Sequence, residues 1–147
     1  MREIKLTDYR EDVERLLRYL PWLESHVATD VSHIYQDNGL TSSSVGFPVY
    51  DSTLLNFVNE ARETGLMDEN YSYVFSQNFI KTLEDEKRAV ENATIKDCQI
   101  LTGVLSKYVL GGMTKGKVWN DAVSSGIWVL ALRRMKKLLE IWDSPLA

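Results

Sequence analysis

The chain has 147 residues, of which 44% are apolar and 26% charged, values that are ordinary for one globular domain. Its formal net charge of −4 and its pI of about 5.2 argue against a protein built as a whole to attract nucleic acid. The single cysteine, Cys98, excludes an internal disulfide and a cysteine-based zinc site. Because we find neither a signal-peptide pattern nor a membrane-length apolar run, we expect one cytoplasmic domain over residues 1–147.

The first fifty residues predict two helices and a loop. Asp8, with Glu11 three residues later, predicts a capped helix whose apolar face runs through residues 9–20. Pro21 interrupts this pattern, because its ring removes a backbone donor. A second helix is expected to continue to about residue 38 on an apolar stripe formed by Leu23, Val27, Val31 and Ile34. Residues 38–50, rich in Gly, Ser and Pro, predict a long loop.

Two further helices are expected in the middle of the chain. Asp51 predicts the start of a helix that ends at Thr64, with Gly65 as its C-terminal stop. Residues 68–73 predict a turn. A longer helix is expected over residues 74–92, with strongly charged outer faces and with Phe79, Ile80, Leu83 and Val90 turned inward.

The C-terminal third predicts the helices around which the rest of the chain packs. Thr94, followed by Asp97, predicts the start of a helix that ends at Gly111-Gly112. A short helix is expected over residues 115–124, and Gly126 separates it from a final helix over residues 126–142. That helix carries one broad apolar face, formed by Trp128, Ala131, Leu132, Met135, Leu138, Leu139 and Trp142. The sequence therefore predicts an all-α, single-domain bundle of six to seven helices.

Two stretches resemble a known domain family. The first is Phe47-Pro48-Val49-Tyr50-Asp51, which leads into a helix ending Thr64-Gly65-Leu66. The second runs from Leu105 through a glycine turn, Gly116-x-x-Trp119 and Ala122-x-x-x-Gly126-Ile127 to Leu132-Arg133-Arg134-Met135-Lys136-Lys137-Leu138. Together they resemble an uncharacterised family of small helical domains in bacterial and prophage-associated proteins. The resemblance implies a helical fold and a bacterial origin, and it supplies no activity and no catalytic residue. Relatives often carry an arginine and an aromatic residue where this chain has Met113-Thr114.

The segment Gly111–Val118 resembles the phosphate-binding loop G-x-x-x-x-G-K-[ST]. Val118 stands where the motif needs a hydroxyl for magnesium, and a helix rather than a strand precedes it. We therefore interpret the segment as a turn between helices. Lys115, Lys117 and the amides that open the short helix keep the alternative of holding a phosphate or sulfate.

The two histidines suggest a metal site on the predicted second helix. His26, Asp30, His33 and Asp37 are spaced so that they share one helix face. His26 and His33 would be roughly 10 Å apart along the axis, so one zinc ion would need ligands from elsewhere. The alternative is a solvated polar face beside the apolar stripe.

The only concentrated basic cluster is formed by Arg133, Arg134, Lys136 and Lys137. Residues 94–147 hold 8 basic and 4 acidic side chains, a net charge of +4. With Lys107, Lys115 and Lys117, the cluster predicts a stripe able to contact nucleic-acid phosphates, if all of these side chains share a face. The alternative is a solvated helix end, favoured by the helix dipole.

No serine, cysteine or carboxylate pair has the spacing of a nucleophile and its base, and no cofactor is predicted. The function most consistent with this pattern is a non-enzymatic interaction or regulatory module of bacterial or prophage origin. It would pair with another protein or, as a homodimer, with itself, through Trp128 and Trp142 of the last helix. The alternatives are a nucleic-acid-binding accessory protein, and an enzyme or metal protein with a pocket around His26, Asp30 or Lys117.

Overall fold

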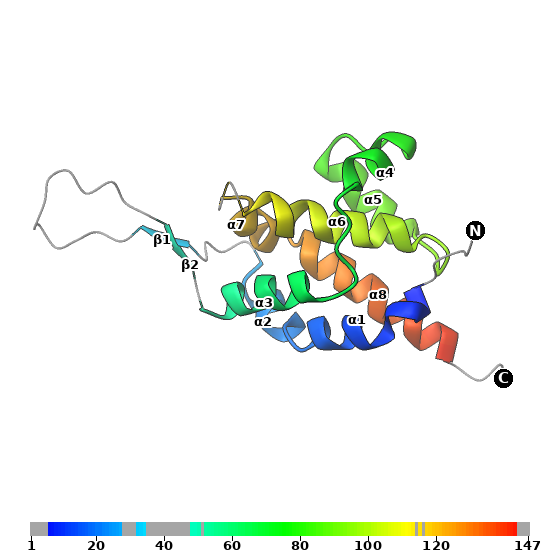
Figure 1. Ribbon diagram of the computed structural model, residues 1–147, viewed down its shortest axis with the longest axis horizontal. Helices are drawn as coiled ribbons and strands as arrows, with labels where there is room; N and C mark the ends of the chain where they lie inside the picture. The colour runs from blue at the N-terminus through cyan, green and yellow to red at the C-terminus, as the bar shows by residue number, and fades with distance from the viewer. Residues whose placement is uncertain are drawn as a thin grey trace, which may run out of the picture.

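The computed structural model describes residues 6–27, 32–34, 48–50, 52–113, 115 and 117–143, and these form an all-α bundle (Figure 1). Apart from one short antiparallel pair of strands, every regular element in these ranges is a helix. In chain order the elements are η1 (Leu6–Tyr9), α1 (Arg10–Leu17), α2 (Leu20–Ser25), β1 (Ser32–Ile34), β2 (Pro48–Tyr50), α3 (Ser52–Glu63), α4 (Tyr71–Gln77), α5 (Leu83–Asn92), α6 (Cys98–Gly111), α7 (Lys117–Ser124) and α8 (Ile127–Asp143). The predicted all-α class is confirmed, but the described residues hold eight α-helices where six to seven were predicted.

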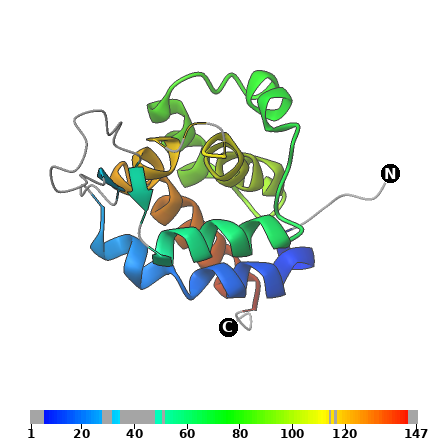
Figure 2. The ribbon, with the colours of Figure 1, turned by 60° about the vertical axis from the view of Figure 1, so that its left-hand side comes forward.

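Helix α8 is the central element of the bundle. It packs against η1, α1, α2, α5, α6 and α7. Helices α1 and α3 lie side by side on one side of it, and α6 crosses on the other (Figures 1 and 2). The predicted apolar face of α8 is buried from Trp128 to Leu139, whereas Trp142, its last member, is exposed. The 3.6-residue period therefore identified the core face of this helix.

Polar side chains of α1 and of Tyr19, which follows it, contact α3 at the edge of this core. The Arg15 guanidinium lies 3.1 Å from a Glu60 oxygen, and the Tyr19 hydroxyl donates a 2.6 Å hydrogen bond to the other. The hydrogen bond from Tyr19, and then those from Arg15, lower the pKa of the Glu60 carboxyl. Beyond the end of α3, the amide of Gly65 donates to Asp12 at 3.0 Å. These contacts fix the pairing of the two helices.

The predicted second helix, which should reach about residue 38, is wrong at two places that the structure describes. His26 follows α2 with non-helical dihedrals, and Ser32–Ile34 pairs with Pro48–Tyr50 as antiparallel strands, with Ser32 opposite Tyr50. Helical spacing placed Ile34 in this helix, but β-branched residues lose rotamer freedom in a helix and are common in strands. The predicted loop over residues 38–50 therefore ends in a strand. Its remainder, residues 38–47, lies outside the described part of the chain.

The predicted helix over residues 74–92 is two helices, α4 and α5. Asn78 and Phe79 end α4, and Phe79 has a left-handed φ of 57°. Thr82 then begins α5 with a capping box, in which its side chain accepts from the Asp85 amide and Asp85 accepts from the Thr82 amide. Phe79 is therefore exposed and not in the core, contrary to the prediction, while Ile80 and Val90 are buried as predicted.

Two predicted helix starts are shifted. Asp8 does not cap a helix, because Leu6–Tyr9 forms a 3₁₀-helix and α1 begins at Arg10 with no side-chain cap. The Thr94–Asp97 pair forms as predicted, with the Asp97 carboxylate accepting from the Thr94 amide at 2.8 Å, but it closes a turn before α6 begins at Cys98. In the described residues, no helix combines the length and the hydropathy that crossing a bilayer requires.

Candidate interaction surface

Three amides in and after the glycine turn that follows α6 donate hydrogen bonds within the protein. The amide of Met113 donates to Leu110, that of Lys115 to Gly111, and that of Val118 to Lys115, at 2.9–3.2 Å. A phosphate-binding loop needs such amides to converge on the anion. The predicted interpretation as a helix–helix turn agrees with this arrangement. Lys115 and Lys117 are exposed beside it.

Gly112 lies against the Trp119 ring. A Cβ atom at position 112 would stand 2.0 Å from two ring atoms of Trp119, and the indole Nε1 donates a 3.0 Å hydrogen bond to the Val109 carbonyl. Close packing, not phosphate binding, therefore explains a glycine at this position.

We expect Gly112→Ala to lower the free energy of unfolding by about 2 kcal/mol, because Trp119 must leave its site and its hydrogen bond. Gly111→Ala is the matched control. Its Cβ would meet only Val118, at 3.5 Å, so we expect no loss of stability there. Thermal unfolding of both variants checks this, and equal losses would contradict the packing argument.

The structure does not place the two histidines on one helix, so the predicted shared face is wrong. His26 follows α2, its Nδ1 lies 2.8 Å from the Trp22 carbonyl, and its ring stacks on the Trp22 ring with centroids 4.2 Å apart. His33 lies in β1, opposite Val49. Asp30 and Asp37 lie outside the described residues. Within the described residues, no three His, Cys, Asp or Glu side chains form a group suited to a metal.

The predicted basic stripe is divided among several partners. Arg133 forms a 2.7 Å ion pair with Glu24, and Arg134 donates to the Ala93 carbonyl at 2.9 Å. Lys107 points instead to Glu86 on α5. Lys136 and Lys137 are exposed on α8. Because Arg133 and Lys107 are paired with carboxylates, the positive charge available to a nucleic-acid backbone is smaller than the sequence suggests.

Glu86 is a buried carboxylate that the sequence analysis missed. It is 1% exposed, and it accepts hydrogen bonds from the Lys107 ammonium and the Tyr108 hydroxyl, both of α6. Burial, and next the bond to Glu86, raise the pKa of Tyr108 above its usual value. The signal was present in the sequence: Glu86 is three residues after Leu83 and four before Val90, on the apolar face of α5. This network joins α5 to α6 inside the protein.

Cys98 is buried, and burial raises the pKa of its thiol to about 11, so a nucleophilic thiolate is rare at neutral pH. The enzyme alternative needs a pocket around His26, Asp30 or Lys117. A surface hollow of about 330 Å³ on the described residues is lined by the segment from Thr7 to Asp12 instead. Nothing in these positions assembles a nucleophile with its base.

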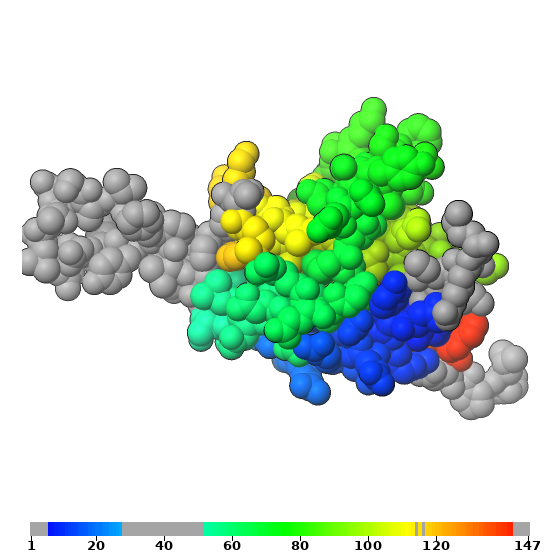
Figure 3. Space-filling view, viewed as in Figure 1, coloured from blue at the N-terminus to red at the C-terminus, as the bar shows by residue number. Residues whose placement is uncertain are grey.

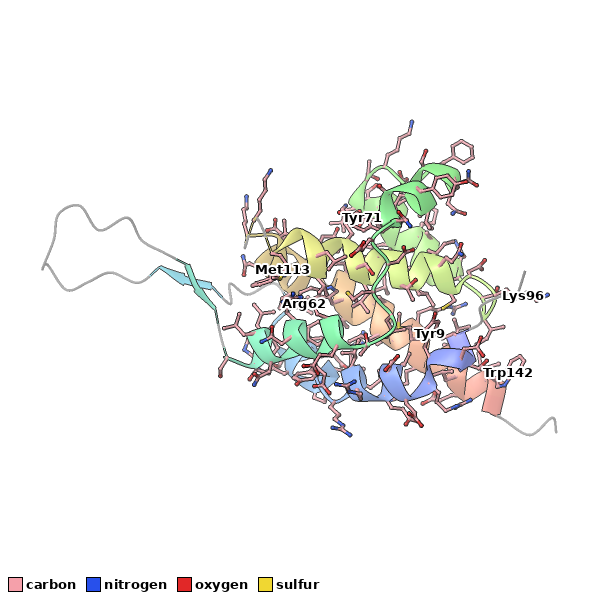
Figure 4. The ribbon with its side chains drawn as sticks, in the orientation of Figure 1. Tyr9, Arg62, Tyr71, Lys96, Met113 and Trp142 are labelled. Carbon is pink, nitrogen blue, oxygen red and sulfur yellow. The ribbon has the colours of Figure 1, made fainter. Side chains whose placement is uncertain are left out.

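Exposed apolar side chains gather at two places. At the end of α8, Trp142 (Figure 4) is 52% exposed and continues the stripe whose earlier members form the core, and Ile141, which lies off that stripe, is 60% exposed. The hairpin of α4 and α5 exposes Phe79 (81%) and, with it, Tyr73. Helix α4 and the turn after it stand out from the body of the molecule in Figure 3, whereas α5 packs against α6 and α8. The interface role predicted for Trp128 is wrong, because its side chain is 0% exposed in the core.

Comparison with known protein families, with curated proteins and with solved structures found no match to this chain. The resemblance to an uncharacterised bacterial and prophage family stays a prediction.

Proposed function

We propose that this chain is a non-enzymatic interaction module of the cytoplasm, which binds a protein through the α4–α5 hairpin. The observation that carries the proposal is Phe79, a large apolar side chain that is 81% exposed on a backbone with φ 57°. An exposed aromatic residue at this position improves neither the stability nor the solubility of the protein. A contact with a partner accounts for both features.

The backbone around Phe79 is a helix end at which glycine is usual. The amide of Ile80 donates to the Phe75 carbonyl at 2.9 Å, and the amide of Phe79 donates to Ser76 at 3.4 Å. This is the Schellman pattern, with Phe79 at its left-handed position and with Phe75 and Ile80 both buried. A side chain in that conformation costs roughly 1–2 kcal/mol relative to the right-handed one.

The rest of the hairpin supports a contact surface. Tyr73 is exposed on α4, and Leu83, at the start of α5, is more than one-third exposed. The end of α8 is the second candidate contact, since Trp142 continues an otherwise buried stripe and Ile141 beside it is exposed. We assign the hairpin the main role because only there does the exposed aromatic residue carry a conformational cost.

Replacing Phe79 by glycine or asparagine tests whether the aromatic ring serves the fold. We expect both variants to raise the free energy of unfolding by about 0.5–1 kcal/mol, because either residue accepts a left-handed φ more readily. For glycine, the expected gain in stability is smaller than the relief of backbone strain alone, because glycine also raises the conformational entropy of the unfolded chain. Urea unfolding followed by circular dichroism measures the difference.

The matched control is Tyr73→Gly, which removes another exposed aromatic ring of α4 from an ordinary helical backbone. There we expect a loss of about 1 kcal/mol. If Phe79→Gly also lost stability, Phe79 would be a structural residue, and the proposal would lose its main support.

A further inference from the structure

We propose that the partner of the α4–α5 hairpin is a second copy of this chain, related by a two-fold axis, with Phe79 of each copy seated on the hairpin of the other. The inference rests on the proposed function and names its partner. Three observations at the hairpin tip, meaning residues 78–80 together with Asp85, Arg88 and Ala89, carry it.

First, the protruding ring and a hollow that can accept a ring lie on the same surface. A hollow of about 220 Å³ lies at the hairpin tip, lined by Asn78, Phe79 and Ile80 from the end of α4 and by Asp85, Arg88, Ala89 and Asn92 from α5. Ile80, which belongs to the core, and Ala89 form the apolar part of its wall, and the other part is polar. An apolar cavity of about 150 Å³ is known to admit benzene, so the hollow has room for a phenyl ring.

Second, this arrangement is self-complementary. In a two-fold contact, the same patch serves both subunits, so a residue that inserts into its partner receives the equivalent residue in return. Phe79 lies at the edge of the hollow that it would fill on the other copy. An unrelated protein would need both a matching hollow and a matching side chain, whereas a second copy supplies both.

Third, the rim carries one charge of each sign. The Arg88 guanidinium lies 3.8 Å from Asp85, a loose pair, and the Arg88 side chain is 70% exposed. Hydrogen bonds from the backbone amides of Lys81 and Thr82 lower the pKa of Asp85 and hold its carboxylate in place. Across a two-fold axis, Arg88 of each copy can reach Asp85 of the other. With such an exchange, opposite charges meet at the contact, although each of the two molecules has a net charge of −4.

The contact is small. A buried aromatic side chain contributes about 150–250 Å². Two such side chains, together with the residues around them, bury less than the roughly 1,200–2,000 Å² of a stable interface. We therefore expect a weak, reversible dimer with a dissociation constant in the high-micromolar range.

Sedimentation velocity of the full chain, from about 20 μM to 1 mM, tests the inference. We expect the average mass of the wild type to rise with concentration. Phe79→Gly should weaken association at least tenfold while remaining folded, and Arg88→Glu should weaken it less. Trp142→Ser, which alters the other exposed apolar surface, should associate like the wild type.

A wild type that stays monomeric at 1 mM would overturn the second-copy inference, and so would undiminished association of Phe79→Gly. Neither result decides the proposed function, which the unfolding measurement on Phe79→Gly tests separately. If that variant gains stability and the wild type is a monomer, the hairpin contacts a different protein.

Discussion

Replacing Trp128 by alanine should lower the free energy of unfolding by about 4 kcal/mol, a large fraction of the stability of a domain of this size. The indole is 0% exposed, and its ring centroid lies 4.9 Å from that of Phe57 on α3. It begins the stripe of α8 on which the surrounding helices pack, so its removal leaves a cavity that several elements would have to close together. Denaturation in urea, followed by circular dichroism, measures the loss.

Trp128→Phe separates the packing of this residue from its polar atom. Among the described residues, the indole Nε1 is a buried donor with no hydrogen-bond partner. Phenylalanine loses ring volume but also removes that unsatisfied group, whose burial costs about 1–3 kcal/mol. We therefore expect Trp128→Phe to cost less than half of what alanine costs. A loss equal to that of alanine would show that Nε1 donates a hydrogen bond after all.

Replacing Glu86 by alanine should lower the free energy of unfolding by about 3 kcal/mol, because it breaks a buried ion pair. The Tyr108 hydroxyl, which is buried, would lose its acceptor, while the half-exposed Lys107 ammonium can turn to water. Because water can solvate the Lys107 ammonium, we expect the loss of stability to lie at the lower end of the range for buried ion pairs. Thermal and urea unfolding at neutral pH both report it.

Two conservative variants divide the contribution of Glu86. Glu86→Gln keeps an oxygen that accepts from Tyr108 and loses the charge that faces Lys107, so we expect a smaller loss than with alanine. Tyr108→Phe should cost about 1 kcal/mol. In the double variant Glu86→Ala with Tyr108→Phe, the loss of stability should be smaller than the sum of the two single losses, because the two residues share one hydrogen bond. Strict additivity would contradict the network.

The helices that the sequence predicted correctly are those with a strong local period. Residues 126–142 repeat apolar side chains every three or four positions, and α8 buries the predicted face from Trp128 to Leu139. The same holds for α3, where the apolar residues that follow the helical period, Leu54, Phe57, Val58 and Ala61, are all buried. Periodicity and end signals are local, so they survive without knowledge of the rest of the chain.

The features that sequence reasoning missed depend on distant residues or on rare conformations. Ser32–Ile34 is a strand because Pro48–Tyr50 lies beside it, and helical spacing alone predicted one continuous helix. The break at Phe79 places a phenylalanine where glycine is usual, so no ordinary stop signal marked it. Glu86 looked like part of a solvated charged face, since only α6 supplies its partners. The candidate surface at the hairpin tip follows from that break and was not predicted.

The central position of α8 bears on how the protein is made. A ribosome synthesises η1, α1, α2, α5, α6 and α7 before the helix that packs against all of them. Until α8 leaves the exit tunnel, the apolar faces that meet it have nothing to cover them, and nascent chains in that condition aggregate readily. The growing polypeptide should therefore require a chaperone or rapid completion, and premature termination before Ile127 should yield an insoluble product.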